Sequence, residues 1–130
     1  MSHFTLIKTK LRDKKHLIEA LELMGHDVQE NQVLVINNPS HAEKHPEFHA
    51  EVAIGTDVGF RWNENRNSYE LVAELDTWNL DVPVDRFIDK LTQQYAVRCL
   101  IASTKEEGYE IEEQKVTNDG SVELVCTRWN

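Results

Sequence analysis

The chain has 130 residues, 40% of them hydrophobic, which suits a single folded domain spanning residues 1–130. Fourteen Lys and Arg against 23 Asp and Glu make the protein acidic, with a formal net charge of −9. A negative field repels phosphate backbones and anionic lipid, and no apolar run is long enough to span a membrane, so we expect neither nucleic acid nor a membrane as a partner.

The first part of the chain predicts a strand, a short helix and a second strand. Residues 3–10 alternate between apolar and polar side chains, as in a half-buried strand. Asp13 suits the N-cap and Gly25 the end of a helix whose apolar side chains recur at Leu17, Leu21 and Met24. Residues 32–37 predict a short buried strand, which ends at Asn37-Asn38-Pro39-Ser40.

The middle of the chain has the period-two pattern of antiparallel strands. Val52 and Ile54 precede a turn at residues 55–57, and the alternation resumes at Val58, Phe60 and Trp62. After a polar loop at residues 63–68, a return strand places its apolar side chains at Tyr69, Leu71, Ala73 and Leu75. We predict a meander with one apolar face, which needs a covering layer.

A long helix and a hairpin complete the predicted fold. Residues 84–107 follow Pro83 and carry an apolar stripe at Ile88, Leu91, Tyr95, Cys99 and Ala102. Residues 109–116 and 121–128 predict a hairpin about Asn118-Asp119-Gly120, with an inner face of Val122, Leu124 and Cys126. We expect an α+β fold in which a mainly antiparallel sheet (meander plus C-terminal hairpin) is covered on one face by one short and one long helix. The strand order stays open.

Several short segments, in this order and spacing, resemble one family. They are Ser2-His3-Phe4-Thr5-Leu6-Ile7-Lys8-Thr9, Asp57-Val58-Gly59-Phe60, Tyr69-Glu70-Leu71-Val72-Ala73, Gln93-Gln94-Tyr95-Ala96, and Asp119-Gly120-Ser121-Val122 with a closing Arg128-Trp129. The chain resembles the hypothetical chloroplast open reading frame thirty-five family, also called domain of unknown function 1257, nearly from end to end.

The resemblance implies an uncharacterised protein of the plastid and cyanobacterial type, without an established reaction or catalytic residues. Bacterial relatives have neighbouring genes for an AAA-type ATPase, a second small uncharacterised protein and a ferredoxin-like protein. The resemblance therefore implies a subunit or adaptor, with an AAA-type ATPase or a ferredoxin-like protein as the candidate partner.

The stretch Ser40-His41-Ala42-Glu43-Lys44-His45-Pro46-Glu47-Phe48-His49-Ala50-Glu51-Val52 is the part of the chain most similar to a metal site. Its histidines recur at intervals of four and could offer imidazole nitrogens to zinc, nickel or copper. Pro46 disfavours a continuous helix, and in an extended chain His45 lies about 13 Å from His49. We expect an exposed loop, and a metal site at His41, His45 and His49 is the alternative.

Aromatic residues and their polar neighbours form the candidate surface for a ligand or partner. Trp78 lies in a loop-like region and Trp129 is the penultimate residue, so neither is assigned to the core. Half-buried tryptophans often anchor a partner, and core or edge packing is the alternative. The candidate residues are Asp57, Gly59, Arg61, Trp62, Tyr69, Trp78, Arg128 and Trp129.

The sequence offers little that resembles catalysis. Cys99 and Cys126 have no Cys-x-x-Cys partner and are expected to be reduced thiols of an intracellular protein, with Cys99 inert on the helix stripe. No pair of groups has complementary catalytic roles, so we predict no catalytic residue and no cofactor, and an enzyme is the less favoured reading. The expected compartment is the cytoplasm, or the plastid stroma if the gene is plastid-encoded.

The leading functional hypothesis is therefore protein–protein interaction. It describes a soluble assembly or adaptor module of a larger complex, with a protein partner and with a homodimer as one form. The alternative is a module that binds a small ligand or a metal, either on the sheet face with Trp62 and Tyr69 or at the histidine-rich loop.

Overall fold

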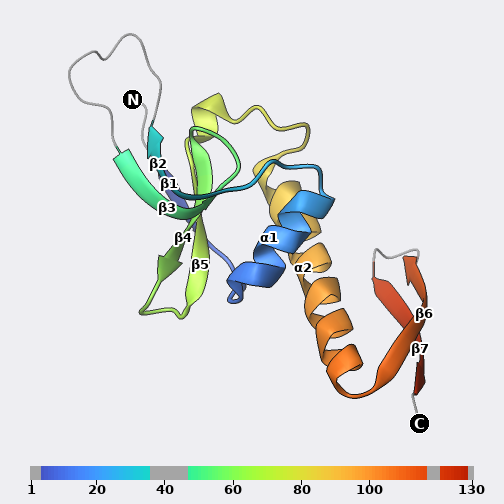
Figure 1. Ribbon diagram of the computed structural model, residues 1–130. Helices are drawn as coiled ribbons and strands as arrows, with labels where there is room; N and C mark the ends of the chain where they lie inside the picture. Colours follow the sequence, from blue (N-terminus) through green and yellow to red (C-terminus); the bar gives the residue numbers. More distant parts are fainter. Residues whose placement is uncertain (1–3, 36–46, 117–120, 129–130) are drawn as a thin grey trace.

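The computed structural model describes residues 4–35, 47–116 and 121–128. In chain order the strands and helices are β1 (Thr5–Lys8), α1 (Lys14–Leu23), β2 (Gln29–Val35), β3 (Glu47–Ala53), β4 (Val58–Asn63), β5 (Ser68–Ala73), the 3₁₀ turn η1 (Leu75–Thr77), α2 (Val84–Glu106), β6 (Tyr109–Val116) and β7 (Val122–Arg128). Figure 1 shows α1 and α2 beside a curved sheet, with β6 and β7 at the far end of α2. The predicted α+β class is confirmed.

The main sheet has five strands in the order β1-β5-β4-β3-β2, and every neighbouring pair is antiparallel. Strands β2 to β5 form the meander, which extends the predicted one by a strand, and β1 adds to its other edge beside β5. The register places Ile7 opposite Leu71 and Trp62 opposite Tyr69. Leu75, predicted to lie in the return strand, lies instead in η1 and is 41% exposed.

One face of the sheet packs against the two helices. Apolar side chains from β3, β4 and β5 meet those of α1 and of the first half of α2, and the fully buried ones include Val52, Phe60, Leu71, Leu17, Leu21, Phe87 and Leu91. Asp13 caps α1 as predicted, because its carboxylate accepts a hydrogen bond of 3.1 Å from the His16 N–H. Gly25 follows α1 with a φ of 92°, a left-handed conformation that suits glycine.

The other face of the sheet has a smaller core, so the predicted single apolar face is wrong. Leu34, Ala50, Ala53 and Val72 are buried there, and Phe4 and Phe48 pack against them with their ring centroids 5.4 Å apart. All six residues of β5 are buried, because this strand lies between β1 and β4 and contributes side chains to the cores on both faces of the sheet. Its continuous burial is typical of a strand covered on both faces.

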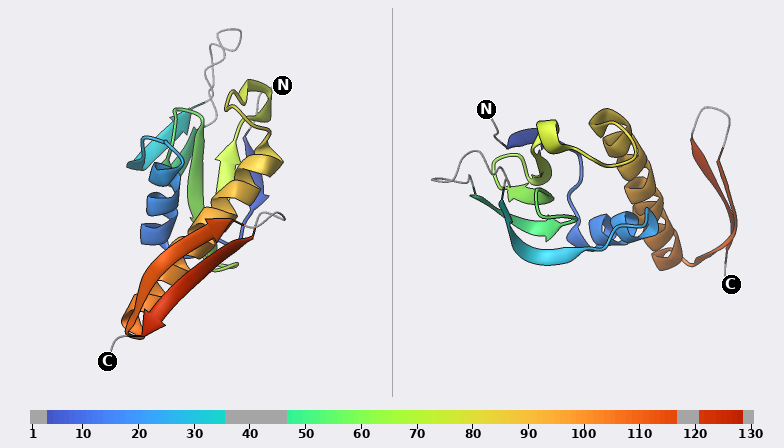
Figure 2. Two further views of the ribbon diagram at one scale, coloured as in Figure 1. Left: turned by 90° about the vertical axis from the view of Figure 1, so that its right-hand side faces the viewer. Right: turned by 90° about the horizontal axis from the view of Figure 1, so that it is seen from above.

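The long helix is uninterrupted, as predicted, but only its first half covers the sheet. Phe87 and Leu91 are buried in the main core, whereas the second half runs past the sheet and packs against β6. Figure 2 shows α2 between the five-stranded sheet and the hairpin. The hairpin therefore does not join the main sheet and forms a two-stranded sheet of its own.

The hairpin has the alternation that the sequence predicts. In β7, Leu124 and Cys126 are half-buried, while Glu123, Val125 and Thr127 are exposed. Within the described residues, no helix combines the length and the apolar character needed to cross a membrane.

Candidate functional site

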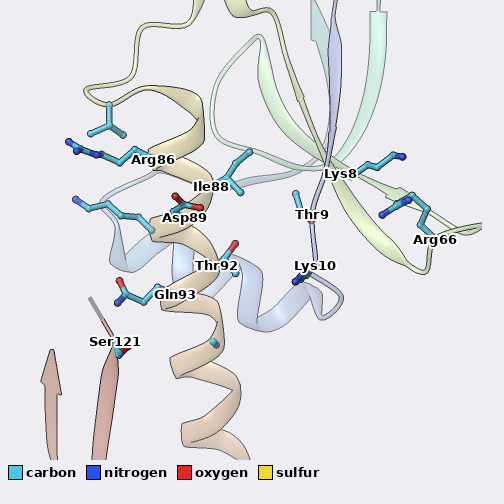
Figure 3. A pocket seen from close by; sticks show the side chains of 13 residues that line it. Lys8, Thr9, Lys10, Arg66, Arg86, Ile88, Asp89, Thr92, Gln93 and Ser121 are labelled. Atoms are coloured by element: carbon cyan, nitrogen blue, oxygen red, sulfur yellow. The ribbon is translucent and has the colours of Figure 1, made fainter. Parts of the chain in front are cut away.

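An open groove lies between the first half of α2 and the part of the sheet around β1 and the β4–β5 turn. Its volume is about 1220 Å³. Figure 3 shows the lining on both sides of α2: Lys8, Lys10 and Arg66 lie on the side of the sheet, and Arg86 projects on the side of Ser121. The basic side chains of the lining are Lys8, Lys10, Arg66, Arg86 and Lys90.

Hydrogen bonds to β5 fix the segment that carries Lys8 and Lys10. The Thr9 hydroxyl donates to the carbonyl of Tyr69, and the Leu11 carbonyl accepts a bond of 2.7 Å from the Tyr69 N–H. Thr9 and Leu11 are both buried. The backbone between two exposed lysines is therefore held against the sheet, so the lysines stay at the edge of the groove.

A turn positions Arg66 in a similar way. The side-chain oxygen of Asn63 accepts hydrogen bonds from the N–H groups of Asn65, at 3.0 Å, and Arg66, at 3.2 Å. This is an Asx-type turn, which Asn forms readily, and Asn67 follows it in the left-handed region with a φ of 54°. The arginine thus projects from a defined turn.

The wall contributed by α2 carries Arg86 and Lys90 four residues apart, hence on the same side of the helix. All five basic side chains are exposed, and none of them forms an ion pair with another residue in the described part of the chain. Among the described residues of the lining, Asp89 is the one carboxylate. The groove is therefore a positive region on a chain of net charge −9.

A smaller hollow of about 360 Å³ lies where the end of α1 faces the start of α2. His26 and Phe87 line it and pack edge to face, with their ring centroids 5.5 Å apart. Burial lowers the pKa of His26 below its ordinary value of 6.5, because the charged imidazolium loses hydration there. The hollow thus combines a neutral imidazole with an aromatic wall.

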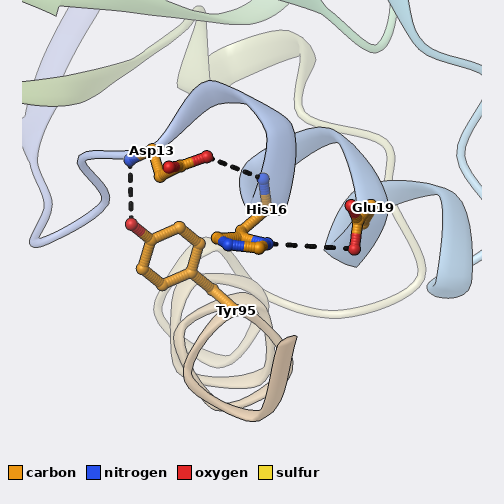
Figure 4. A network of polar contacts seen from close by, with 4 residues as sticks. All are labelled: Asp13, His16, Glu19 and Tyr95. Carbon is orange, nitrogen blue, oxygen red and sulfur yellow. Dashed lines mark hydrogen bonds and ion pairs between the residues drawn. The ribbon is translucent and has the colours of Figure 1, made fainter. Parts of the chain in front are cut away.

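A tyrosine joins the two helices. The Tyr95 hydroxyl on α2 accepts hydrogen bonds from the backbone N–H groups of Arg12, at 3.1 Å, and Asp13, at 2.8 Å, just before α1 begins. Figure 4 shows His16 beside this contact, with its Nδ1 3.9 Å from a carboxylate oxygen of Glu19. The arrangement satisfies donors at a helix start, so its evident role is structural.

Cys99 lies one turn along α2 from Tyr95. Burial raises the pKa of its thiol, and a hydrogen bond with Tyr95 opposes that rise only in part. A thiol with a raised pKa forms little of the reactive thiolate near neutral pH. The geometry agrees with the inert thiol that the sequence predicts.

The structure places the predicted aromatic residues in separate contacts. Trp62 and Tyr69 pack edge to face with ring centroids 5.0 Å apart, and both belong to the main core. Trp78 packs against Phe87, and its indole N–H donates to the Val82 carbonyl at 2.8 Å. Arg61 lies on the other face of the sheet, 5.3 Å from the centre of the Phe48 ring.

The remaining candidates are also dispersed. The Asp57 carboxylate accepts a hydrogen bond of 2.8 Å from the Thr77 hydroxyl. Gly59 is buried where a Cβ would lie 2.7 Å from the Val52 carbonyl oxygen, so its evident role is close backbone packing. The side chain of Arg128 and all of Trp129 lie outside the described residues. A partner role for this set stays a prediction.

The histidine-rich stretch is described only from residue 47 onward, so His41 and His45 lie outside the described residues. His49 is on β3, not in a loop, and its Nδ1 lies 4.0 Å from a carboxylate oxygen of Glu51. In the part of the chain that the structure describes, no three His, Cys, Asp or Glu side chains gather as a metal site would require. The metal hypothesis stays a prediction.

Comparison with known proteins identifies the family. The family described as "Protein of unknown function (DUF1257)" matches residues 20–125. The chain belongs to this family. This DUF1257 chain is 35% identical over 136 residues to "Uncharacterized protein ycf35" of Pyropia yezoensis, covering 100% of this chain and 99% of the relative. It is 30% identical over 132 residues to the ycf35 protein of Cyanophora paradoxa, covering 99% and 98%.

The predicted resemblance is therefore confirmed, since ycf35 is the plastid reading frame named from the sequence. No solved structure matches this DUF1257 chain. The names of the family and of these relatives state no activity, ligand or partner.

The basic groove was not predicted from the sequence. Lys8 and Lys10 belong to a visible basic group near the N-terminus, but Arg66, Arg86 and Lys90 are scattered among acidic residues. For Arg86 and Lys90 the sequence does hold a signal, because their i, i+4 spacing places both side chains on one face of a helix. Nothing local connects that face to the end of β1.

Proposed function

We propose that this protein is an interaction module of a larger assembly, and that its C-terminal hairpin binds a partner protein. The observation that carries the proposal is the isolation of β6 and β7. In the described part of the chain they pair only with each other, and β6 packs on α2, apart from the five-stranded sheet. A lone two-stranded hairpin is marginally stable in water, so a further packing surface would stabilise it.

The surface formed by the hairpin and the adjoining helix α2 suits a protein partner. Val125 on β7 is 40% exposed and Leu100 on α2 is 48% exposed, which leaves apolar area on both elements. Strand edges also present unpaired N–H and C=O groups to which another chain can add. A partner that packs on the hairpin would cover the exposed apolar side chains and also pair with the N–H and C=O groups of a strand edge.

A native pull-down with the full chain tests the proposal, combined with light scattering to measure its mass in solution. We expect wild type to retain a defined partner, or to form a homodimer, and Val125→Glu to lose it because a charge enters the contact. Val33→Glu is the matched control, since Val33 is also exposed but lies on β2. A monomeric wild type without a partner, or equal loss in both variants, would refute the proposal.

The hollow beside His26 supports a second candidate function, the binding of a small ligand. Its volume of about 360 Å³ falls within the range of small-molecule sites, and it combines apolar walls with polar groups. A compound that raises the melting temperature of wild type but not of His26→Gln would identify this hollow as a ligand site.

A further inference from the structure

We propose that the basic groove binds an extended acidic segment of a partner protein. The proposal deepens the interaction function above and rests on it, because it specifies the chemistry of a partner. The lining reaches the hairpin segment at Ser121 but does not include Val125, so the two surfaces can be tested separately.

The charges of the groove are the first argument. Five basic side chains line it against one carboxylate, Asp89, and none of the five is neutralised by an ion pair within the described residues. Elsewhere the half-buried Lys14 is neutralised, because it pairs with Glu30 at 2.8 Å. Like charges held along one groove repel one another, and an anionic occupant would remove that repulsion.

The shape of the groove decides the size of the occupant. A phosphate is bound by donors that converge on one point, usually from a glycine-rich loop or a helix N-terminus. Here the cations come from the end of β1, a turn and a helix, and they are distributed along an open groove of about 1220 Å³. Several carboxylates spaced along an extended chain match this distribution better than a single anion does.

The charge of the whole protein decides the class of the occupant. A nucleic acid or a bilayer extends well beyond the groove and would meet the rest of a chain whose net charge is −9. A short acidic segment engages only the positive region. The lining also includes Ile88, Val82 and Ala96, apolar contacts that suit side chains between the carboxylates.

The test measures fluorescence anisotropy of a short labelled peptide of alternating Glu and Ser, titrated with the full-length protein at low ionic strength. We expect saturable binding that the double variant Arg86→Glu with Lys90→Glu weakens by about tenfold or more, since two attractive contacts become repulsive. The matched control is Lys15→Glu with Lys105→Glu, which changes the net charge equally on residues that do not line the groove. It should change the affinity much less. Melting curves confirm that both variants fold.

Any of four results would overturn the proposal. The first is that the peptide does not bind wild type, and the second is that both double variants weaken its binding equally. The third is that a short single-stranded oligonucleotide, inorganic phosphate or phosphatidylglycerol vesicles bind the groove more tightly than the peptide does. Self-association that is lost on groove reversal, without peptide binding, would also overturn it by making a second copy the occupant. Val125→Glu separates the two proposals, because a failure of the hairpin function should leave peptide binding unchanged.

Discussion

Removing one hydroxyl group from α2 should destabilise the whole domain. In Tyr95→Phe the ring stays in place, but the backbone N–H groups of Arg12 and Asp13 lose their acceptor, at 3.1 and 2.8 Å, and the weaker hydrogen bond with the Cys99 thiol is lost too. A typical hydrogen bond contributes about 0.5–1.5 kcal/mol net, so two give about 1–3 kcal/mol. Because Arg12 and Asp13 are exposed, water can replace part of the lost hydrogen bonding. We therefore expect the free energy of unfolding to fall by about 1–2 kcal/mol.

Urea denaturation followed by circular dichroism measures this loss directly, and a thermal scan should show a melting temperature lower by about 4–8 °C. Tyr69→Phe is the matched control, because the Tyr69 hydroxyl makes no hydrogen bond to any described residue although the ring is buried. That variant should lie within about 0.5 kcal/mol of wild type. If the two variants are equally stable, the Tyr95 hydroxyl does not join the helices as we infer.

Two further predictions test other parts of the fold. Gly59→Ala should lower the unfolding free energy by about 1–3 kcal/mol, because the new methyl group would lie 2.7 Å from the Val52 carbonyl oxygen; urea denaturation that gives wild-type stability would contradict this packing. His26 is predicted to make stability pH-dependent: its folded-state pKa is lowered from 6.5, so the unfolded chain takes up the proton first as pH falls. Wild type should therefore lose stability below about pH 6.5, down to the folded-state pKa, relative to His26→Gln, and parallel melting profiles of the two proteins across that window would exclude a role for His26.

Much of the fold could be predicted because its signals are local. Asp13 caps α1 through its own neighbours, and Gly25 follows that helix at a φ of 92°. Such positions depend on backbone geometry within one turn, which the residue type reveals. The alternation of Leu124 and Cys126 likewise identified the inner face of the hairpin.

The arrangement of these parts was harder to predict, because a pattern shows that a face is buried but not what covers it. The stripe on α2 was expected to lie across one sheet, whereas Phe87 and Leu91 pack on the sheet and the second half of the helix packs on β6. The small core on the other face of the sheet includes Val72 of β5, where the other residues on that face, Ser68 and Glu70, are polar. The alternation of Tyr69, Leu71 and Ala73 therefore indicated a single apolar face.

The groove was missed for a related reason. Lys8 and Arg86 are far apart in sequence, and they line one groove only because β1 pairs with β5 while α2 packs beside that part of the fold. The visible basic group near the N-terminus also divides between two environments. Lys8 and Lys10 line the groove, whereas Lys14 pairs with Glu30 on β2.

The segments that form the two proposed surfaces differ in the charge of their residues although one helix connects them. The first half of α2 contributes Arg86 and Lys90 to the groove, and beyond its other end residues 109–128 carry five Asp and Glu against one Lys and one Arg. We therefore expect an acidic segment to be attracted to the groove and repelled by the hairpin, whose own proposed contact would depend on apolar area and strand edges. If both proposals hold, two surfaces that select different chemistry on one helix would allow a small domain to hold two segments at once, as an adaptor must.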